Sequence, residues 1–578
     1  MTDAHDAVAA AQKALADAQA ALAAAQAAAG QAAGRPAARP TGASAATSAE
    51  SSSGLVPLTV DQVAAIRVGY AFEAPALEMG ALMNGAAVPD VPIRIPIAMV
   101  NRHGLVAGAT GTGKTKTLQL LAEQLSAAGV PVFAADIKGD LSGIASPGTE
   151  NPALLERTSG IGQRWVPASA PTEYFTLGGL GTGIPIRASV RGFGSVLLSK
   201  VLGLNPTQES SLGLVFHYAE QAGLPLVDLA DLRSVLMYLI GDEGKGELAS
   251  LGGLSKATAG VILRELITFA DQGADVFFGE PAIDVQKFLR LAPDGVRGLV
   301  SLLEVPSVYD KPELFSTFLM WLLSELYDAL PEVGDVPKPR LVFFFDEAHL
   351  LFNGASKDFM QLVTQTVRLI RSKGVGIFFV TQTPKDVPGE VLAQLGSRVQ
   401  HQLRAHTPDD ARALKATVST YPISGYDLAQ VLQNLATGEA IVTVMNEKGA
   451  PSPVAWTRLR APQSSMSPTP AELQAAAVAG SALLAEYGTP VDPVSAREIL
   501  EQKEHVALAQ AQLGTVQGKA QRAASTGSAR SARAERAAAD RAERERAKAN
   551  DRLRRQTVNA GVRIARLIVG KLFGSTRR

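Results

Sequence analysis

The chain carries the octapeptide Gly108-Ala109-Thr110-Gly111-Thr112-Gly113-Lys114-Thr115, which has the form G-x-x-x-x-G-K-T. Residues 104–107 before it are apolar, as in a buried strand, and residues 117–125 after it have helical periodicity. In the order strand, glycine-rich turn, helix, this motif presents backbone N–H groups to phosphate oxygens, and a Cβ at the glycine positions would block their approach. The motif therefore predicts a P-loop, in which Lys114 reaches the β- and γ-phosphates and the Thr115 hydroxyl binds Mg²⁺.

The composition limits the classes of protein that the chain can form. It has 578 residues, of which 46% are hydrophobic and 19% charged, so a large globular core is expected. The formal net charge is zero, which offers no global argument for nucleic acid binding. The absence of cysteine excludes disulfides and thiolate metal sites. No apolar stretch approaches the roughly 18 residues of a membrane span, and no signal peptide pattern opens the chain, so we expect a cytoplasmic protein.

Changes in composition divide the chain into three parts. Residues 1–54 are an alanine-rich segment, expected to form a helix, followed by a flexible linker rich in Ala, Ser, Gly and Pro. Residues 55–463 have the mixed patterns of a globular α/β domain. Residues 464–578 are predicted to be a helical tail, and its part from 519 onward is basic, with 17 Lys and Arg against 5 Asp and Glu.

The apolar runs of the middle part predict a mainly parallel sheet. Residues 130–136 form the next buried strand after the P-loop helix, which makes a β-α-β unit. Residues 91–100 alternate but contain prolines, a pattern that favours an edge strand. Residues 190–330 have largely helical spacing, and we interpret them as a helical insertion between two strands of the sheet.

A second stretch with chemical character spans residues 340–349. Five apolar residues form a strand that ends in the adjacent carboxylates Asp346 and Glu347. An apolar strand that ends in Asp-Glu, downstream of a P-loop, is a Walker B pattern. Asp346 would then hold Mg²⁺, and Glu347 would orient and activate the attacking water. Together the two stretches predict an ATP-hydrolysing enzyme that uses Mg²⁺.

Several polar residues remain with two interpretations each. Gln382 follows the next buried strand and either contacts the γ-phosphate and its water or is an ordinary strand-end glutamine. Asp136 either joins the shell of the metal and water or caps the loop that follows it. His103 and His349 are interpreted as loop or core residues, because no cluster has the spacing of a metal site.

Three arginines are candidates for contacting nucleotide. Arg371 ends a predicted helix, so it is either a cation at the helix C-terminus or an arginine finger that reaches the nucleotide of a neighbouring subunit. Arg368, on the same helix, is a competitor. Arg102 lies just before the P-loop strand and is another.

Four motifs carry a family resemblance: residues 101–104 ahead of the P-loop, 136–141, 343–352 and 381–384. With these motifs the chain resembles the bacterial HerA-like helicase and ATPase family, and in particular the YjgR-like proteins formerly described as a domain of unknown function. The resemblance continues through the insertion at 204–209 and 277–282 and covers roughly residues 57–463.

The resemblance implies a RecA-like core of the HerA/FtsK branch, with the strand before Gln382 between the two Walker strands. It also implies a homo-oligomeric ring, expected to be a hexamer, with ATP between subunits. By motif position, Arg371 is the best match to the branch's trans-acting arginine, and Arg102 is the second. In that branch, ATP turnover moves duplex DNA through the ring.

The alternative hypothesis is a P-loop ATPase that drives a non-DNA process, such as protein remodelling or assembly at a membrane. The basic C-terminal tail fits either duplex DNA or an anionic membrane surface, or is a solvated, interaction-prone tail. A third hypothesis is a nucleotide-dependent scaffold with little turnover. No small-molecule substrate other than ATP is expected.

Overall fold

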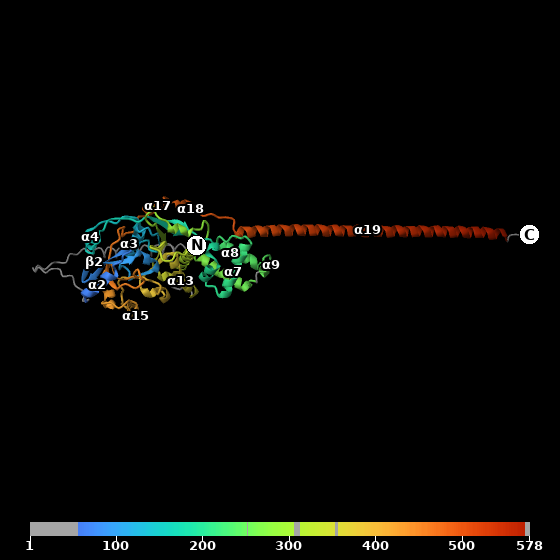
Figure 1. Cartoon of the computed structure of the whole chain (residues 1–578). Coiled ribbons are helices and arrows are strands. Elements are labelled where there is room, and N and C mark those ends of the chain that lie inside the picture. Colours follow the sequence, from blue (N-terminus) through green and yellow to red (C-terminus); the bar gives the residue numbers. More distant parts are fainter. Residues whose placement is uncertain (1–55, 251–252, 306–311, 353–356, 573–578) are drawn as a thin grey trace, which may run out of the picture. The chain divides into compact units, whose positions relative to one another are not determined.

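The computed structural model describes residues 56–250, 253–305, 312–352 and 357–572 (Figure 1). The helix predicted within residues 1–54 lies outside these described residues.

One twelve-stranded sheet runs through the described part of the chain, in the order β2-β1-β12-β11-β10-β3-β9-β8-β4-β7-β5-β6. The strands are β1 (Ala76–Asn84), β2 (Ala86–Pro96), β3 (Gly104–Ala107), β4 (Val132–Asp136), β5 (Thr172–Leu177), β6 (Ile184–Ile186), β7 (Val300–Glu304), β8 (Leu341–Phe345), β9 (Val375–Thr381), β10 (Ser397–Gln400), β11 (Glu439–Thr443) and β12 (Ala455–Leu459).

The strands from β10 to β6 are all parallel to their neighbours. The four strands β3, β4, β8 and β9 are buried along their whole length, as expected for apolar runs covered on both faces. Phenylalanine rings join β4 to β8 and β8 to β9, with Phe133 stacked on Phe343 at 4.6 Å and Phe345 on Phe379 at 5.4 Å between centroids. Strand β9 lies between β3 and β8, which confirms the strand order that the RecA-like resemblance implied.

The other side of the sheet is antiparallel. Strands β10, β11, β12, β1 and β2 pair in that order, and β2 is the edge strand. Pro89 and Pro92 of this strand are exposed, and the edge position predicted for this segment is confirmed by the strand order.

Helices surround the sheet, and nine of those given below begin with a side-chain cap. They are α2 (Val60–Gly69), α3 (Lys114–Ala127), α4 (Pro152–Ser159), α5 (Val190–Phe193), α6 (Ser195–Val201), α7 (Pro206–Gln221), α8 (Leu229–Ile240), α9 (Lys245–Ser250), α10 (Lys256–Asp271), α11 (Pro312–Ala329), α12 (His349–Phe352), α13 (Lys357–Ile370), α14 (Gly389–Leu392), α15 (Pro408–Val418), α16 (Leu428–Asn434), α17 (Ala471–Ala479), α18 (Ala482–Tyr487) and α19 (Ala496–Leu572). Short 3₁₀ helices η1 (Ile97–Arg102) and η6 (Arg371–Lys373) precede β3 and β9.

The predicted insertion differs from the structure at one place. Helices α5 to α10 form a helical segment, and Asn205 opens α7 with a capping box to Gln208. Strand β7, however, falls inside the range 190–330 and pairs between β4 and β5. Its five residues were too short an apolar run to separate from the surrounding helical pattern.

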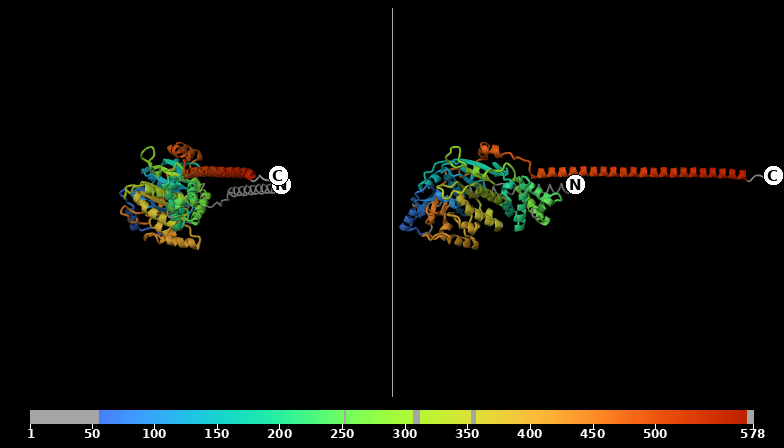
Figure 2. Two further views of the ribbon diagram at one scale, coloured as in Figure 1. Left: turned by 90° about the vertical axis from the view of Figure 1, so that its right-hand side faces the viewer. Right: turned by 45° about the vertical axis from the view of Figure 1, so that its right-hand side comes forward.

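Packing also continues beyond residue 463, where we expected the compact domain to end. Val478 and Tyr487 are buried in the main core, and so is Leu500 on the first turns of α19. Ser495 and the backbone of Arg497 bond to Asp231 of α8, which anchors the start of α19. From there α19 continues as one helix of 77 residues, visible in both views of Figure 2.

Candidate nucleotide-binding and hydrolysis site

The P-loop motif forms the turn between β3 and α3, as the sequence predicts. Gly113 is the N-cap of α3 and has a φ of 113°, which a residue with a side chain rarely adopts. A Cβ on Gly108 would lie 2.4 Å from the Cβ of His401. The two glycines therefore allow a backbone path that no other residue could follow at these positions.

Lys114 and Thr115 begin α3, at its positive end. The Lys114 ammonium donates to the carbonyl oxygens of Gly108 at 2.8 Å and Ala109 at 3.3 Å, which holds it over the loop. Burial lowers the pKa of Lys114, and the nearby carboxylates Glu347 and Asp346 oppose that shift. The Thr115 hydroxyl lies 3.2 Å from a carboxylate oxygen of Asp140. The Walker A side chains thus face the acidic end of β8 and the loop after β4.

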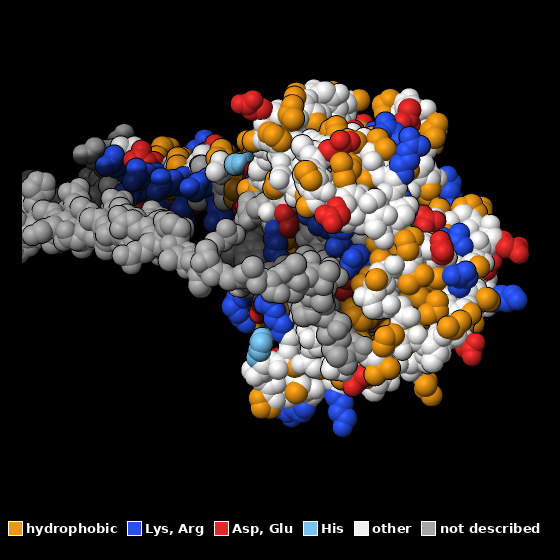
Figure 3. Space-filling model, turned by 90° about the vertical axis from the view of Figure 1, so that its left-hand side faces the viewer, with side chains coloured by type: hydrophobic (Ala, Val, Ile, Leu, Met, Phe, Trp, Pro, Cys, Tyr) orange, Lys and Arg blue, Asp and Glu red, His pale blue; other side chains and the backbone are white. Residues whose placement is uncertain are grey.

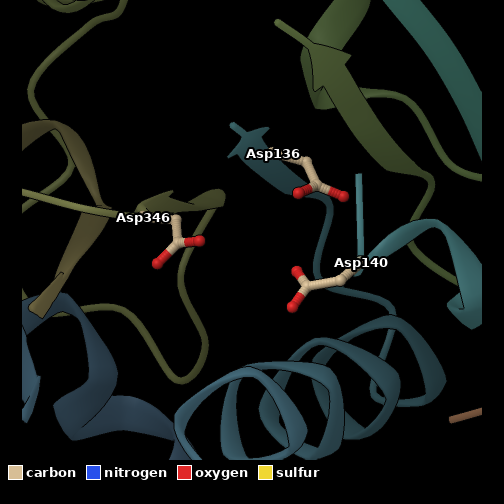
Figure 4. A group of neighbouring side chains, drawn as sticks. All are labelled: Asp136, Asp140 and Asp346. Carbon is tan, nitrogen blue, oxygen red and sulfur yellow. The ribbon is translucent and has the colours of Figure 1, made fainter. Parts of the chain in front are cut away.

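Three aspartates come together at this place. Carboxylate oxygens of Asp136, Asp140 and Asp346 lie within 4.8 Å of one another, and Figure 4 shows the three side chains directed toward one space. Burial is the main cause that raises the pKa of Asp346 to about 7, and the adjacent Glu347 adds to it. Burial likewise raises the pKa of Asp136 to about 6. Carboxyl groups crowded in this way favour a cation that keeps them ionised.

The donor set fits Mg²⁺. All its donors are oxygens, which Mg²⁺ prefers, and one buried oxygen of Asp140 has no hydrogen-bond partner. Thr115 and Asp346 were expected as ligands, and the structure adds Asp140 beside them. Asp136 is already engaged, because its two oxygens accept from the backbone N–H groups of Gly139 and Leu141, both at 2.8 Å. These contacts match the interpretation of Asp136 as the cap of the following loop. Its place in the aspartate cluster also keeps it close to the proposed metal.

Glu347 follows Asp346 in a left-handed backbone conformation, with a φ of 47°. Its side chain is 4% exposed and forms an ion pair with Lys138. The second carboxylate oxygen lies 3.3 Å from Nδ1 of His349. His349 therefore lies within reach of Glu347, whereas His103 is a core residue whose Nδ1 accepts from the backbone N–H of Ile377.

Gln382 is the first residue after β9 and is exposed. The neighbouring carbonyl of Thr381 accepts from the N–H of Gly108 at 3.2 Å, so the end of β9 adjoins the P-loop. Gln382 shares a hollow of about 260 Å³ with Ala109 and Thr110. The side chain is thus beside the loop, and its contact with a γ-phosphate stays a prediction.

Arg102 and Arg371 lie together at the amino ends of the parallel strands, opposite the ends that carry the P-loop. Each precedes the amino end of a strand, β3 or β9, whereas the P-loop follows the carboxyl end of β3. Both guanidinium groups approach Asp335, at 3.8 Å and 3.6 Å. Burial and the charge of Arg371 lower the pKa of Arg102. The length of a strand separates the two arginines from the P-loop of the same chain, so within one subunit Arg102 does not line the nucleotide site. The third candidate, Arg368, is exposed on α13.

A cavity of about 520 Å³ opens on the outer side of the P-loop. It borders Gly113, Lys116 and Thr117, and its lining also includes α4 residues and residues of the segment 461–467 after β12. Lys116 donates to the carbonyl of Met466 at 2.7 Å, and Trp165 donates to the carbonyl of Pro462 at 2.8 Å.

The sequence interpretation missed three features of this site: Asp140, Lys138 and the cavity. The first two lie in the stretch 136–141, which carries part of the family resemblance, but the sequence interpretation gave a role there to Asp136 alone. A Lys and an Asp close together at the carboxyl end of a strand were a usable signal. The cavity walls come from segments up to about 350 residues apart, and no local pattern identifies them.

A family model described as the C-terminal part of HerA-like helicases matches residues 82–578. A probable helicase of Methanocaldococcus jannaschii is 23% identical over 361 residues, which are 60% of this chain and 64% of the relative. A protein of Sulfolobus acidocaldarius named DNA double-strand break repair helicase HerA is 24% identical over 379 residues, 64% of this chain and 67% of the relative. The chain thus spans about two thirds of the length of these relatives.

Among solved structures, the bacterial conjugative coupling protein TrwB aligns with a TM-score of 0.47 and 15% identity, over 72% of this chain and 95% of that protein. VirB4 of Thermoanaerobacter pseudethanolicus aligns with a TM-score of 0.40 and 15% identity, over 67% of this chain and 97% of that one. Within the part of the chain that the structure describes, no helix combines the length and the apolarity needed to cross a membrane.

Proposed function

The chain belongs to the HerA-like C-terminal helicase family, and from this premise we propose that it hydrolyses ATP with Mg²⁺ and uses the reaction to move duplex DNA. One observation carries the proposal: Lys114 lies near Glu347 and Asp346 at the end of β8, and Thr115 contacts Asp140, which clusters with Asp346. A phosphate-binding lysine opposite a buried Asp-Glu pair is the arrangement that phosphoryl transfer to water requires.

Each residue has a role set by its position. The loop N–H groups and Lys114 would bind the β- and γ-phosphates, and Thr115, Asp140 and Asp346 would hold Mg²⁺. Mg²⁺ held by these residues would neutralise the negative charge of the phosphates. Glu347 would accept the proton of the attacking water, since its buried carboxylate keeps one oxygen without a hydrogen bond.

The cavity beside Gly113 is suited to the nucleoside. The γ-phosphate must lie toward Glu347, so the opposite end of the triphosphate leaves the loop past the first turn of α3, where the cavity opens. Its volume of about 520 Å³ lies in the range of small-ligand sites.

The arginine pair supports a ring of like subunits. Arg102 and Arg371 are remote from their own P-loop, and among the described residues both pair with one carboxylate, that of the highly exposed Asp335. In a head-to-tail ring the amino edge of one sheet would meet the carboxyl edge of the next, and Arg371 would complete the neighbour's site. We propose six subunits, as in the HerA/FtsK branch.

Duplex DNA is the proposed substrate because one relative is named as a DNA break repair helicase and because the chain has a basic helix. Basic and acidic side chains are interspersed on the face of the core in Figure 3, whereas Lys and Arg predominate on the visible part of α19. The alternative is an ATPase that acts on proteins or at an anionic membrane. It would use the same hydrolysis site but would not be stimulated by DNA.

The test measures ATP hydrolysis with and without duplex DNA across a salt series. We expect stimulation by DNA at low salt that disappears as salt rises, because phosphate contacts depend on counterion release. Lys114→Ala and Glu347→Gln should lower turnover at least about 100-fold, whereas Lys245→Ala, in an exposed ion pair with Asp242, should not. Hydrolysis without any DNA stimulation at low salt would favour the alternative, and unchanged turnover in either site variant would reject the site.

A further inference from the structure

Glu347 forms an ion pair with Lys138. In the described part of the chain, its only other ion-pair partner is the imidazole of His349. The lysine side chain is 44% exposed, whereas the glutamate side chain is 4% exposed. An exposed ammonium is thus directed inward onto the buried carboxylate that is proposed to activate water.

The turn that presents Lys138 is built for this position. Asp136 accepts from the N–H groups of Gly139 and Leu141, which closes the backbone around Lys138. Gly139 has a φ of 73°, a conformation that favours glycine. The lysine is therefore held on a defined turn at the carboxyl end of β4.

Two ammonium groups, those of Lys138 and Lys114, lie near each other at this turn. Lys138 is close enough to Lys114 for its charge to contribute to the lowered pKa of the P-loop lysine, although burial is the larger cause. Two ammonium groups on one side of a site repel each other, and an oxyanion between them removes that repulsion.

The γ-phosphate would lie within reach of Lys138. A general base lies about 2.6–3.2 Å from the water that it activates, and that water lies about 3–3.5 Å from the phosphorus in a reactive arrangement. These two distances and one ion-pair contact of about 3 Å place the Lys138 ammonium within roughly 10 Å of the phosphorus. Rotations about the bonds of the flexible four-carbon side chain can shorten that distance by several ångströms.

We propose that Lys138 is a second phosphate-binding lysine that exchanges the carboxylate of Glu347 for the γ-phosphate of ATP. This inference rests on the proposed hydrolysis at the same site. Once the ammonium has moved, Glu347 takes a proton from water while the water oxygen bonds to the γ-phosphorus. The bond from that phosphorus to the bridging oxygen of ADP breaks, and ADP and phosphate are the products.

The test compares the affinities of Lys138→Met and the wild type for ADP and for adenylyl imidodiphosphate, a non-hydrolysable ATP analogue. ADP affinity should stay within about twofold, and analogue affinity should fall at least about tenfold, because one charge-assisted contact to the γ-phosphate is lost. Lys138→Arg should recover part of the analogue affinity. Lys287→Met, which removes a lysine from a surface pair with Glu486, is the matched control and should change neither.

A double-mutant cycle separates exchange from simple phosphate attraction. Glu347→Gln frees Lys138, so it should raise analogue affinity, and that gain should shrink in the Lys138→Met background. Equal losses for ADP and analogue, or no loss for the analogue, would overturn the proposal while leaving ATP hydrolysis intact. If the wild type bound neither nucleotide, the proposed function itself would fail. Lys138→Gln replaces the Met variant if thermal melting shows that the latter does not fold.

Discussion

At the scale of single residues, the site brings together carboxylate side chains whose like charges repel one another. The carboxylates at the ends of β4, β7 and β8 are adjacent because their strands are neighbours in the sheet. Glu304 is paired in register with Asp136, and one of its oxygens is buried without a hydrogen bond. Burial first, and the charge of Asp136 second, raise the pKa of Glu304 to about 7 from 4.5.

This shift predicts a pH effect on stability. Between pH 4.5 and about 7 the folded protein keeps a proton on Glu304 that the unfolded chain releases, so the free energy of unfolding falls as pH rises through that window. Glu304→Gln carries no such proton. Its free energy of unfolding relative to the wild type should therefore rise between pH 5 and pH 8, by about 1–2 kcal/mol after allowance for solvent screening.

Urea unfolding of both proteins at pH 5 and pH 8 measures the difference. Glu220→Gln, at an exposed ion pair with Arg191, is the control and should show no pH-dependent difference. A constant difference between Glu304→Gln and the wild type at the two pH values would contradict the assignment.

At the scale of elements, the P-loop helix α3 binds the segment 461–467, which lines the cavity. Glu123 of α3 accepts from the N–H groups of Gln463 at 2.8 Å and Ser464 at 2.9 Å, and also from the Ser464 hydroxyl. Gln119 donates to the carbonyl of Ser465 at 2.7 Å. One helix thus carries the phosphate-binding residues at its start and holds the cavity wall through its middle turns.

Glu123→Ala should loosen this wall. The variant leaves two backbone N–H groups without their acceptor, so we expect a loss of stability of about 1–3 kcal/mol. If the cavity receives the nucleoside, affinity for ATP and ADP should fall together, while affinity for inorganic triphosphate should change little. Glu220→Ala is the control for removal of an exposed glutamate. Equal weakening of all three ligands would place the effect in the P-loop and not in the cavity.

At the scale of the whole molecule, the two ends of the parallel strands carry the two groups of side chains that the proposed reaction would use. The P-loop and its carboxylates occupy the carboxyl edge, and Arg102 and Arg371 occupy the amino edge. A single copy cannot bring these groups together, since the strands between them are rigid and buried. Assembly of several copies would bring the arginines of one copy to the P-loop of another.

Arg371→Ala therefore should lose most ATP hydrolysis, by about 10³-fold or more, while it keeps nucleotide affinity. Mixing it with Glu347→Gln subunits should restore part of the activity, because an intact arginine from one subunit then faces an intact Glu347 of another. The mixture is compared with each variant alone at the same total concentration. Full activity of Arg371→Ala by itself would reject the trans role, and the same series with Arg102→Ala ranks the two arginines.

Local sequence was sufficient for the parts of this protein whose conformation depends on near neighbours. The glycines around Lys114, the apolar runs of β3, β8 and β9, and the Asp346–Glu347 pair identified the P-loop, the buried strands and the acidic strand end, because backbone freedom and burial act over a few residues. The tertiary structure alone decided that Asp140 meets Thr115, that Lys138 meets Glu347, and that Arg102 and Arg371 share the opposite edge. Two of these contacts, Lys138 with Glu347 and Arg102 with Asp335, join residues more than about 200 positions apart. All of them depend on the order in which the strands pair, which no local pattern encodes.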